Sequence, residues 1–482
     1  MFSRSWFIIV VSGVLAGGIS QAQAAVTPLS TDILRSGVPL PPPVVSKIVP
    51  ERDFSSDLLG NAWGSRDWLA DHGIDLVLYD TEEAWGAVAG SLPSGGTYDG
   101  VTALALSLDS WPMFGWRGGL FHISALQIRS GLLSGQYPAL LNGFSGYSVG
   151  RSTRLFEVWY GQSFLKDSVD IRMGVIDPDT EFLVSDNASL FLNASFGWPL
   201  STSNNLYAGG PSWPFSSPAV RVKWAPTKAW TLMSLVADDN PTGSSFYSRT
   251  TPLQNDPSGL LFSTGTGALF MEEIHYHVDL GKIVSGENAP SLPGTWKVGF
   301  LYDSGSFPDR RYDAQGHLLA SPESSGIPRY HRGDWTWYAV IDQMIWRQSP
   351  GSAKTISFFA RPLVSRSSHS AFDLEMESGL TFDGLVPGRT DDTIGVAWGA
   401  SFYSRDAIRN VQDQDRMGAA VPYQLKPEQH IEITYQAALT PYLILQPDLQ
   451  YFLHPSGMSR NADTGRVMSH ELIVGVNMTV TL

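Results

Sequence analysis

Residues 372–382 read FDLEMESGLTF, and this stretch decides the fold that the sequence predicts. Successive side chains of a β-strand point to opposite faces, so the acidic Asp373, Glu375 and Glu377 share one face with Thr381. The other face is apolar and holds Phe372, Leu374, Met376, Leu380 and Phe382. Because charged side chains need water, this strand fits a sheet with one wet face and one apolar face.

The same alternation occurs elsewhere in the chain. In PAVRVKWAP (218–226), Arg221 and Lys223 oppose Val220, Val222 and Trp224. The last stretch runs to the chain end, and its apolar face holds Leu472, Val474, Val476, Met478, Val480 and Leu482. Its other face is polar or small, with Glu471, Gly475, Asn477, Thr479 and Thr481. Segments of this kind, separated by turn residues, are typical of a membrane β-barrel.

Stretches with this pattern predict about sixteen strands, an even number that leaves an aqueous channel inside a closed barrel. The predicted strands span 74–85, 98–111, 118–129, 153–163, 169–176, 218–225, 230–236, 268–279, 295–303, 335–346, 354–364, 372–382, 392–403, 428–439, 442–453 and 469–482. We therefore expect an all-β fold, a transmembrane antiparallel β-barrel.

The connections mostly alternate between short and long. The turns PMFGWR, APTKA and TP are short, whereas the long loops lie near 130–152, 177–217, 237–267 and 304–334. In membrane barrels, short turns face the periplasm and long loops face the outside of the cell.

A soluble, secreted β-sandwich or propeller would also alternate apolar and polar residues. Two observations favour the membrane. No blade-like repeat is found, and many strands end their apolar face in an aromatic residue, as in membrane-interface girdles. These aromatic residues include Trp224, Trp230, Trp296, Tyr302, Trp335, Tyr435 and Tyr442. The mean hydropathy of −0.06 agrees, because alternation cancels the average in a barrel.

The first residues predict export. A basic start at residues 1–4, an apolar run at 6–16 and the small-x-small pattern Ala22-Gln23-Ala24 indicate a signal peptide, residues 1–24, cleaved after Ala24. The apolar run is shorter than the roughly 20 residues that a membrane anchor needs.

The next segment, residues 25–62, is rich in proline and predicts an extended periplasmic lead-in. The predicted barrel domain then spans 63–482 and opens with a short helix at 63–73, which Ser65 caps and Gly73 ends.

Composition excludes several classes of function. The chain has no cysteine, which removes disulfides, thiolate metal sites and cysteine nucleophiles. A formal net charge of −14 argues against binding nucleic acid, which demands a basic surface. We predict no cofactor, and the expected partners are permeating solutes and outer-membrane lipid.

Four motifs carry a resemblance to a known family: WGSRDWLADHGIDL (63–76), DSWPMFGWRGGLFHIS (109–124), IRMGVIDPDTEFLVSDNASLFLNASFGWP (171–199) and LQPDLQYFLHPSG (445–457). With these motifs the chain resembles the carbohydrate-selective porin family, OprB. The resemblance implies a sixteen-stranded outer-membrane barrel of a Gram-negative bacterium, passive uptake of sugars and polyols, and a pore narrowed by loops that fold inward.

The segment from Asp177 to Ser217 is the predicted constriction loop. Aromatic faces pack on sugar C–H surfaces, while carboxylates hydrogen-bond sugar hydroxyls. Its candidate side chains are Asp177, Asp179, Glu181, Asp186, Trp198, Tyr207 and Trp213. The alternative is an ordinary solvated loop, or an Asp-rich calcium site, although the spacing does not match an EF-hand.

Basic side chains are predicted to face this loop from the lumen wall and so to set up a field across the pore. They are Arg172, Arg221, Lys223 and Arg361. Glu273, His275, His277 and Asp279 also share one face of a strand. We interpret this row as wet lumen wall rather than a metal site, because no third ligand is identifiable.

The main alternatives to a porin are an outer-membrane barrel enzyme and an adhesive surface barrel. An enzyme is disfavoured because no local motif such as G-x-S-x-G organises a nucleophile. The sequence leaves open whether the barrel is a homotrimer or a monomer.

Overall fold

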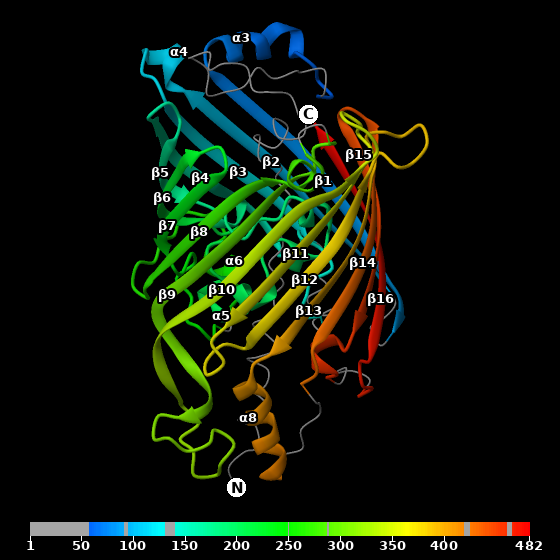
Figure 1. Ribbon diagram of the computed structural model, residues 1–482. Coiled ribbons are helices and arrows are strands. Elements are labelled where there is room, and N and C mark those ends of the chain that lie inside the picture. The colour runs from blue at the N-terminus through cyan, green and yellow to red at the C-terminus, as the bar shows by residue number, and fades with distance from the viewer. Residues whose placement is uncertain are drawn as a thin grey trace.

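The computed structural model describes residues 57–90, 95–130, 140–248, 250–286, 289–418, 425–459 and 465–482. The predicted signal peptide and most of the lead-in, residues 1–56, lie outside the described residues. Sixteen antiparallel strands pair in sequence order, and β1 pairs with β16 to close the barrel (Figure 1). Closure leaves no unpaired sheet edge. In lipid this is necessary, because every backbone polar group of a strand must be paired within the protein.

Each of the sixteen predicted strands has a counterpart in the structure. The strands are β1 (Ile74–Gly90), β2 (Gly95–Asp109), β3 (Gly119–Ser130), β4 (Arg151–Phe164), β5 (Val169–Ile176), β6 (Ser217–Thr227), β7 (Trp230–Asp238), β8 (Ala268–Asp279), β9 (Pro293–Asp313), β10 (Pro328–Arg347), β11 (Thr355–Ser365), β12 (Phe372–Asp383), β13 (Thr393–Tyr403), β14 (Glu428–Thr440), β15 (Leu443–Leu453) and β16 (His470–Thr481). The predicted all-β barrel is confirmed.

The largest difference in strand length is at β9 and β10. The predicted loop 304–334 was wrong, because these strands continue as a paired hairpin and leave 314–327 as the connection. The outer part of this hairpin contains Gly305, Pro308 and several charged residues, which break the apolar alternation. Phe307, Asp309 and Arg310 in this part are buried against neighbouring segments, so the apolar and polar residues do not sort onto two faces as they do in lipid.

Short helices lie at the barrel ends and in the loops. They are α3 (Ser65–Asp71), α4 (Ser110–Phe114), α5 (Leu200–Asn205), α6 (Pro252–Asn255), α7 (Leu280–Ser285) and α8 (Arg405–Arg416), with 3-10 turns such as η2 (Ala62–Gly64). None of the helices in the described ranges is long and apolar enough to cross a bilayer.

The predicted helix before the barrel is present as η2 and α3, with one correction. Gly64, not Ser65, precedes α3, and the Ser65 hydroxyl donates to the Ala62 carbonyl instead of capping the helix. Gly73 ends the segment with a positive φ of 76°, as predicted. The helix lies beside the C-terminal end of the barrel (Figure 1), where Arg66 donates to the Leu482 carbonyl.

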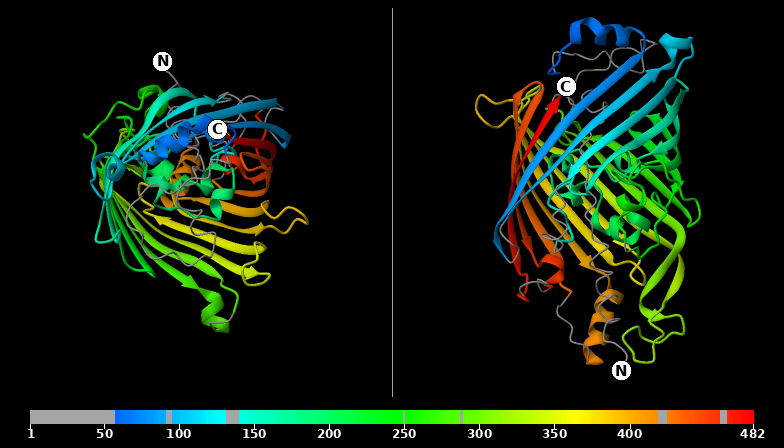
Figure 2. Two further views of the ribbon diagram at one scale, coloured as in Figure 1. Left: turned by 90° about the horizontal axis from the view of Figure 1, so that it is seen from above. Right: turned by 180° about the vertical axis from the view of Figure 1, so that it is seen from behind.

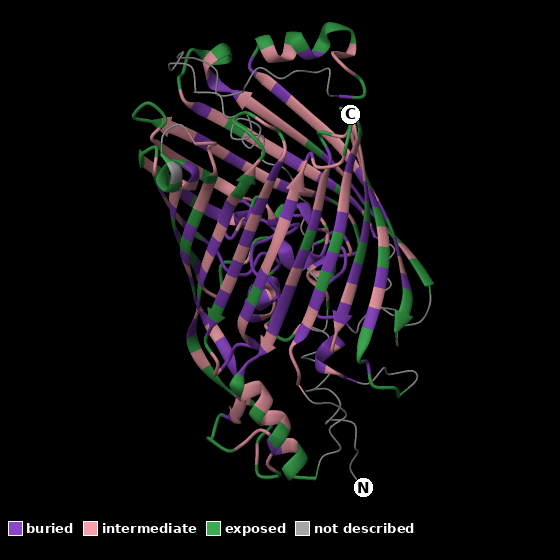
Figure 3. Ribbon diagram, turned by 45° about the vertical axis from the view of Figure 1, so that its right-hand side comes forward, coloured by how far each residue is buried: buried purple, intermediate pink, exposed green. Residues whose placement is uncertain are grey.

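Inward and outward faces follow the predicted register. Arg221 is 1% exposed inside the barrel, and its neighbour Val222 is 37% exposed outside. Figure 3 shows the same alternation of buried and exposed residues along many strands. Trp224, Trp230 and Trp296 are among the exposed outward aromatics.

Phe372 was assigned to the wrong face. A register shift between Phe372 and Leu374 turns the Phe372 ring inward, where it is 1% exposed and packs on Tyr403. A bulge inserts one residue and reverses every later position, so alternation alone does not locate it.

The lipid face yields a first prediction. Val222→Arg places a charge toward the bilayer, which costs about 2–4 kcal/mol near the midplane, so we expect less folded barrel in lipid vesicles. Lys223→Gln, on the lumen side of the same strand, is the control and should fold like the parent. Equal folding of both variants, measured by the heat-dependent gel shift of the folded barrel, would contradict the register.

Candidate pore constriction

The connection between β5 and β6, residues 177–216, folds into the barrel instead of covering its end. Figure 2 shows this segment inside the ring of strands when the barrel is seen from above. We call it the inward loop. Most of its residues are buried, and its backbone polar groups therefore need partners within the protein.

Carboxylates on the inner wall bind backbone N–H groups of the inward loop. Glu273 of β8 accepts from the Leu183 N–H at 2.9 Å. Glu375 of β12 accepts from the N–H groups of Leu200 at 3.1 Å and Ser201 at 2.7 Å. Hydrogen bonds to a charged acceptor are roughly twice as strong as neutral ones, so each carboxylate is a firm anchor.

Two further wall carboxylates act in the same way. Asp342 of β10 accepts from the Ser185 hydroxyl at 2.6 Å and from the Asn187 side-chain amide at 2.9 Å. Glu432 of β14 accepts from the N–H groups of Leu192 and Asn193 at 2.5 and 3.0 Å. The inward loop is thus attached to strands along β8 to β14.

A buried arginine supplies the complementary donors. Arg361 of β11 donates to the carbonyls of Leu183, Ser195 and Gly197 at 2.6, 2.7 and 2.8 Å, and its Nε donates to Glu377 at 2.7 Å. Its side chain is fully buried. Arg361 therefore anchors the loop, and it does not face the pore as the sequence predicted.

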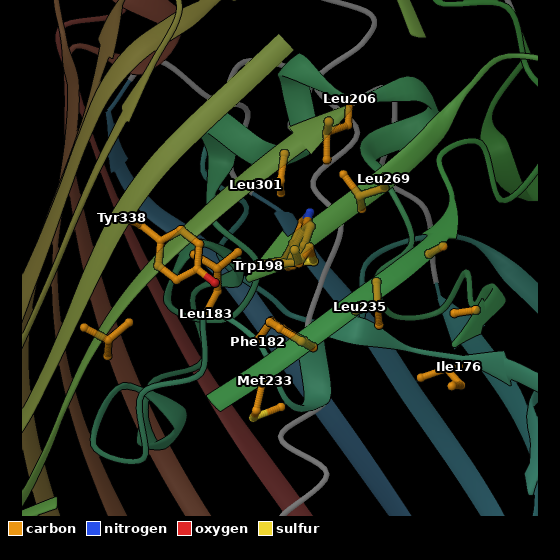
Figure 4. Packing of buried hydrophobic residues seen from close by; sticks show 14 of the residues in the cluster. Ile176, Phe182, Leu183, Trp198, Leu206, Met233, Leu235, Leu269, Leu301 and Tyr338 are labelled. Atoms are coloured by element: carbon orange, nitrogen blue, oxygen red, sulfur yellow. The ribbon is translucent and has the colours of Figure 1, made fainter. Parts of the chain in front are cut away.

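Apolar packing also holds the inward loop against the barrel wall. Phe182, Leu183 and Trp198 lie against the wall residues Leu235, Leu269, Leu301 and Tyr338 (Figure 4). Where the loop covers it, the inner wall therefore combines apolar side chains with the buried charged anchors. Burying these side chains stabilises the folded state by about 25 cal/mol for each Å² of apolar area removed from water.

A second segment, residues 140–150, also folds inward. Glu428 accepts from the N–H groups of Leu141 and Asn142 at 3.0 and 2.7 Å. The two inward segments meet through backbone hydrogen bonds, from Ala194 N–H to Gly143 O and from Gly146 N–H to Leu192 O. Both segments narrow the lumen together.

Ionised side chains meet where the inward loop begins. Glu181 of the loop accepts from Arg172 of β5 at 2.5 Å and from Arg221 of β6 at 3.0 Å. Arg221 also pairs with Asp170. The Arg172 guanidinium lies 4.3 Å from the centre of the Trp159 ring, a cation–π contact.

Three of the predicted acidic residues of the loop, Asp177, Asp179 and Glu181, differ in how burial and charged neighbours affect their protonation. Burial raises the pKa of Asp177 well above its usual value and that of Asp179 to about 6. Burial also raises the pKa of Glu181, but Arg172 and Arg221 outweigh this effect and lower it. Glu181 is therefore the ionised carboxylate of the three, whereas Asp177 and Asp179 keep a proton to higher pH.

Two charged side chains of the predicted set are exposed. Asp186 on the loop and Lys223 on β6 both reach solvent, and neither forms an ion pair with a described residue. They are the charges that a permeant can meet without breaking a contact of the fold.

The predicted aromatic residues have a packing role. Trp198 and Trp213 are 2% and 1% exposed, and the Trp198 indole donates to the Gly209 carbonyl at 2.9 Å. Tyr207 is also buried and donates to the Ser306 carbonyl. Their burial does not fit the expectation that their faces contact a sugar.

The predicted row on β8 does not converge on one point. His275 pairs with Glu273, whereas His277 hydrogen-bonds Thr295 at 3.1 Å. Asp279 caps α7 by accepting from Lys282 N–H. No group of three or more ligand-type side chains is arranged for a metal within the described ranges.

Sequence reasoning missed the anchoring residues Asp342, Glu428 and Glu432. All three are acidic residues at inward positions of predicted strands, which is the signal that could have found them. That signal does not tell a buried anchor from a solvated wall residue, because both satisfy the same alternation.

Comparison with known proteins decides the family. The sequence model of "Carbohydrate-selective porin, OprB family" matches residues 94–482. The chain belongs to the carbohydrate-selective porin family, OprB. This OprB-family protein is an outer-membrane carbohydrate porin.

Individual relatives are distant but cover most of the OprB-family barrel. Porin B of Pseudomonas aeruginosa is 23% identical over 425 residues, which cover 83% of this chain and 87% of that protein. The putative porin QuiX of Acinetobacter baylyi is 20% identical over 66% of this chain and 68% of its own length. The high-pH structure of Pseudomonas putida OprB has a TM-score of 0.76 at 21% identity, covering 90% of this chain and all of that one.

The anchor network yields a second prediction. Arg361→Met removes three bonds to the inward loop and leaves Glu377 buried without its cation, a loss of about 3–5 kcal/mol. We expect a folded barrel with a loosened loop, seen as faster protease cleavage within 177–216 and noisier single-channel current. Arg366→Met, at an exposed position five residues on, is the control. Parent-like cleavage and current in Arg361→Met would show that this anchor is dispensable.

Proposed function

We propose that this porin lets monosaccharides, polyols and related small polar solutes diffuse passively through a passage beside the inward loop. The observation that carries the proposal is the fixed position of that loop, which wall carboxylates and Arg361 hold inside the barrel. A sixteen-stranded barrel is wide enough for an aqueous channel, and a fixed loop reduces it to a selective opening.

Charges of opposite sign support a transverse field at this opening. Glu181 and Asp186 belong to the loop, whereas Arg172 and Lys223 belong to wall strands β5 and β6. Sugar hydroxyls both donate and accept hydrogen bonds, so they can exchange water for either sign of side chain. An ion is attracted by one side and repelled by the other, which favours neutral polar solutes.

The opening that we propose is therefore lined by fewer residues than the sequence predicted. Its proposed lining consists of Arg172, Glu181, Asp186 and Lys223, because these side chains are at least partly exposed. Asp177, Asp179, Arg221 and Arg361 act from behind them by holding the loop. The family and the fold indicate a channel rather than an enzyme, and no contact described above favours catalysis or adhesion.

Liposome swelling tests the substrate class. Vesicles containing the porin are diluted into isotonic sugars, polyols, sugar acids or amino acids of matched size. We expect neutral sugars and polyols to enter faster than the charged solutes, because the fixed charges oppose net charge in the opening. Equal rates across the panel would contradict selectivity, and the absence of swelling and conductance would contradict the channel.

The two exposed charges allow a matched pair of variants. Lys223→Gln should move ion preference toward cations, and Asp186→Asn should move it toward anions, because each removes one fixed charge of opposite sign. The change is read as the reversal potential in a salt gradient. Neutral-sugar swelling should change less, since amides still hydrogen-bond hydroxyls.

The pair also provides its own control, since both replacements preserve side-chain polarity and break no ion pair of the described fold. Reversal potentials that stay at the parent value, or that shift in one direction in both variants, would place the narrow point elsewhere in the lumen.

A further inference from the structure

His277 of β8 is partly exposed on the inner wall of the barrel. It shares the inward face of the strand with Glu273, which binds the inward loop, because alternate side chains of a strand point the same way. Ile274, on the other face, is 48% exposed toward lipid. The imidazole of His277 therefore belongs to the lumen, although the lining proposed above does not include it.

Both ring nitrogens of His277 have hydroxyl partners. Nε2 lies 3.4 Å from Oγ1 of Thr231 on β7, and Nδ1 lies 3.1 Å from Oγ1 of Thr295 on β9. A neutral imidazole offers one N–H and the imidazolium offers two, whereas a hydroxyl can either donate or accept. The two threonines can therefore hold the ring in both protonation states, and a change of charge breaks no contact.

His275, two residues earlier on the same face, is held differently. Its Nε2 pairs with the Glu273 carboxylate, and a carboxylate only accepts, so this contact needs an N–H at that nitrogen. His277 forms no ion pair with a residue of the described ranges. Histidine is the side chain that changes its charge between about pH 5 and about pH 8, and no partner of His277 fixes one state of the ring.

One exposed charge of the proposed opening lies on the β6 side of His277. Lys223 of β6 pairs across the sheet with Met233 of β7. Thr231, which holds the imidazole, is two residues from Met233 on the same inward face. The charge of Lys223 therefore acts on His277 through the lumen.

The other exposed charge lies on the β10 side. Thr295, the second partner of His277, pairs directly with Asp342 of β10. Asp342 accepts from the Asp186 N–H at 3.2 Å, which fixes this part of the inward loop beside the wall. Asp186 also acts on His277. The imidazole thus stands between one exposed positive charge and one exposed negative charge.

The remaining charged groups around His277 are engaged in contacts of the fold. Lys297 donates to a carbonyl of the inward loop at 2.7 Å, Glu273 and His275 pair with each other, and the wall carboxylates bind the loop or cap α7. These groups are Lys297 on β9, Asp342 on β10, and Glu273, His275 and Asp279 on β8 itself.

We propose that His277 sets the charge preference of the passage and so decides how freely sugar acids enter beside neutral sugars. With a neutral imidazole, Lys223 and Asp186 oppose one another as one charge of each sign. The imidazolium adds a positive charge between them, which attracts anions and opposes cations. Because the ring gains its charge as the pH falls, the preference moves toward anions in acid. This role rests on the proposed passage beside the inward loop.

Reversal potentials in a salt gradient test the role of His277. Between about pH 8 and about pH 5, we expect the cation-to-anion permeability ratio of the parent to fall about twofold. His277→Gln keeps a polar side chain without a charge, so its ratio should stay near the parent value of the higher pH. His277→Lys carries a fixed charge and should prefer anions at both pH values.

Sugar-acid entry provides a second measurement. Relative to a neutral sugar of matched size, we expect sugar acids to swell parent liposomes faster at about pH 5 than at about pH 8, and this gain should be lost in His277→Gln. His317→Gln is the matched control. Its side chain is 47% exposed in the connection between β9 and β10, beyond the end of the barrel (Figure 1), so it should behave like the parent.

Two results would overturn the proposal. The first is a parent-like pH shift of the reversal potential in His277→Gln, and the second is an equal loss of that shift in His317→Gln. Swelling of parent vesicles in neutral sugar keeps this inference separate from the proposed function. Its absence would contradict the passage itself, whereas normal swelling with an unaltered shift in His277→Gln would contradict only the role of His277.

Discussion

The structure depends on carboxylates of the inner wall that bind the backbone of an inward-folded loop. Glu273, Asp342, Glu375 and Glu432 accept N–H groups that have no strand or helix partner, and Arg361 donates to carbonyls of the same loop. A buried loop without such partners would leave its backbone groups unsatisfied, at a cost of about 1–3 kcal/mol each. The position of the pore therefore follows from these bonds more than from the barrel itself.

This constraint separates structural charges from functional ones. Arg221 and Arg361 are buried and paired, so their charges stabilise the position of Glu181 and of the loop. Lys223 and Asp186 are exposed, and they are the charges that we propose act on a solute. A field across an opening requires fixed charges that water and permeant can reach, and burial decides which charges those are.

On the outer surface, too, charged side chains occur where they are paired. Where a strand faces lipid, as at Val222 and Val298, its outward side chains are apolar. Where β1 to β4 carry Asp80 and Arg129 outward, the charges are paired with one another. Both surfaces of this barrel thus contain exceptions to simple alternation, and the inner exception marks the place where the loop packs on the wall.

The sequence by itself determined the barrel, because a period of two with one wet face is a local property of each strand. Strands 169–176 and 268–279 were predicted with the bounds that the structure has. Alternation failed at Phe372, where a bulge reverses the faces, and in the outer parts of β9 and β10, where buried polar and charged residues such as Asp309 and Arg310 interrupt it. Only the tertiary structure decided which inward charges are buried as anchors of the loop and which stay exposed. Glu181 and Asp179 are two residues apart in sequence, yet pairing with Arg172 and Arg221 keeps the first ionised while burial favours protonation of the second.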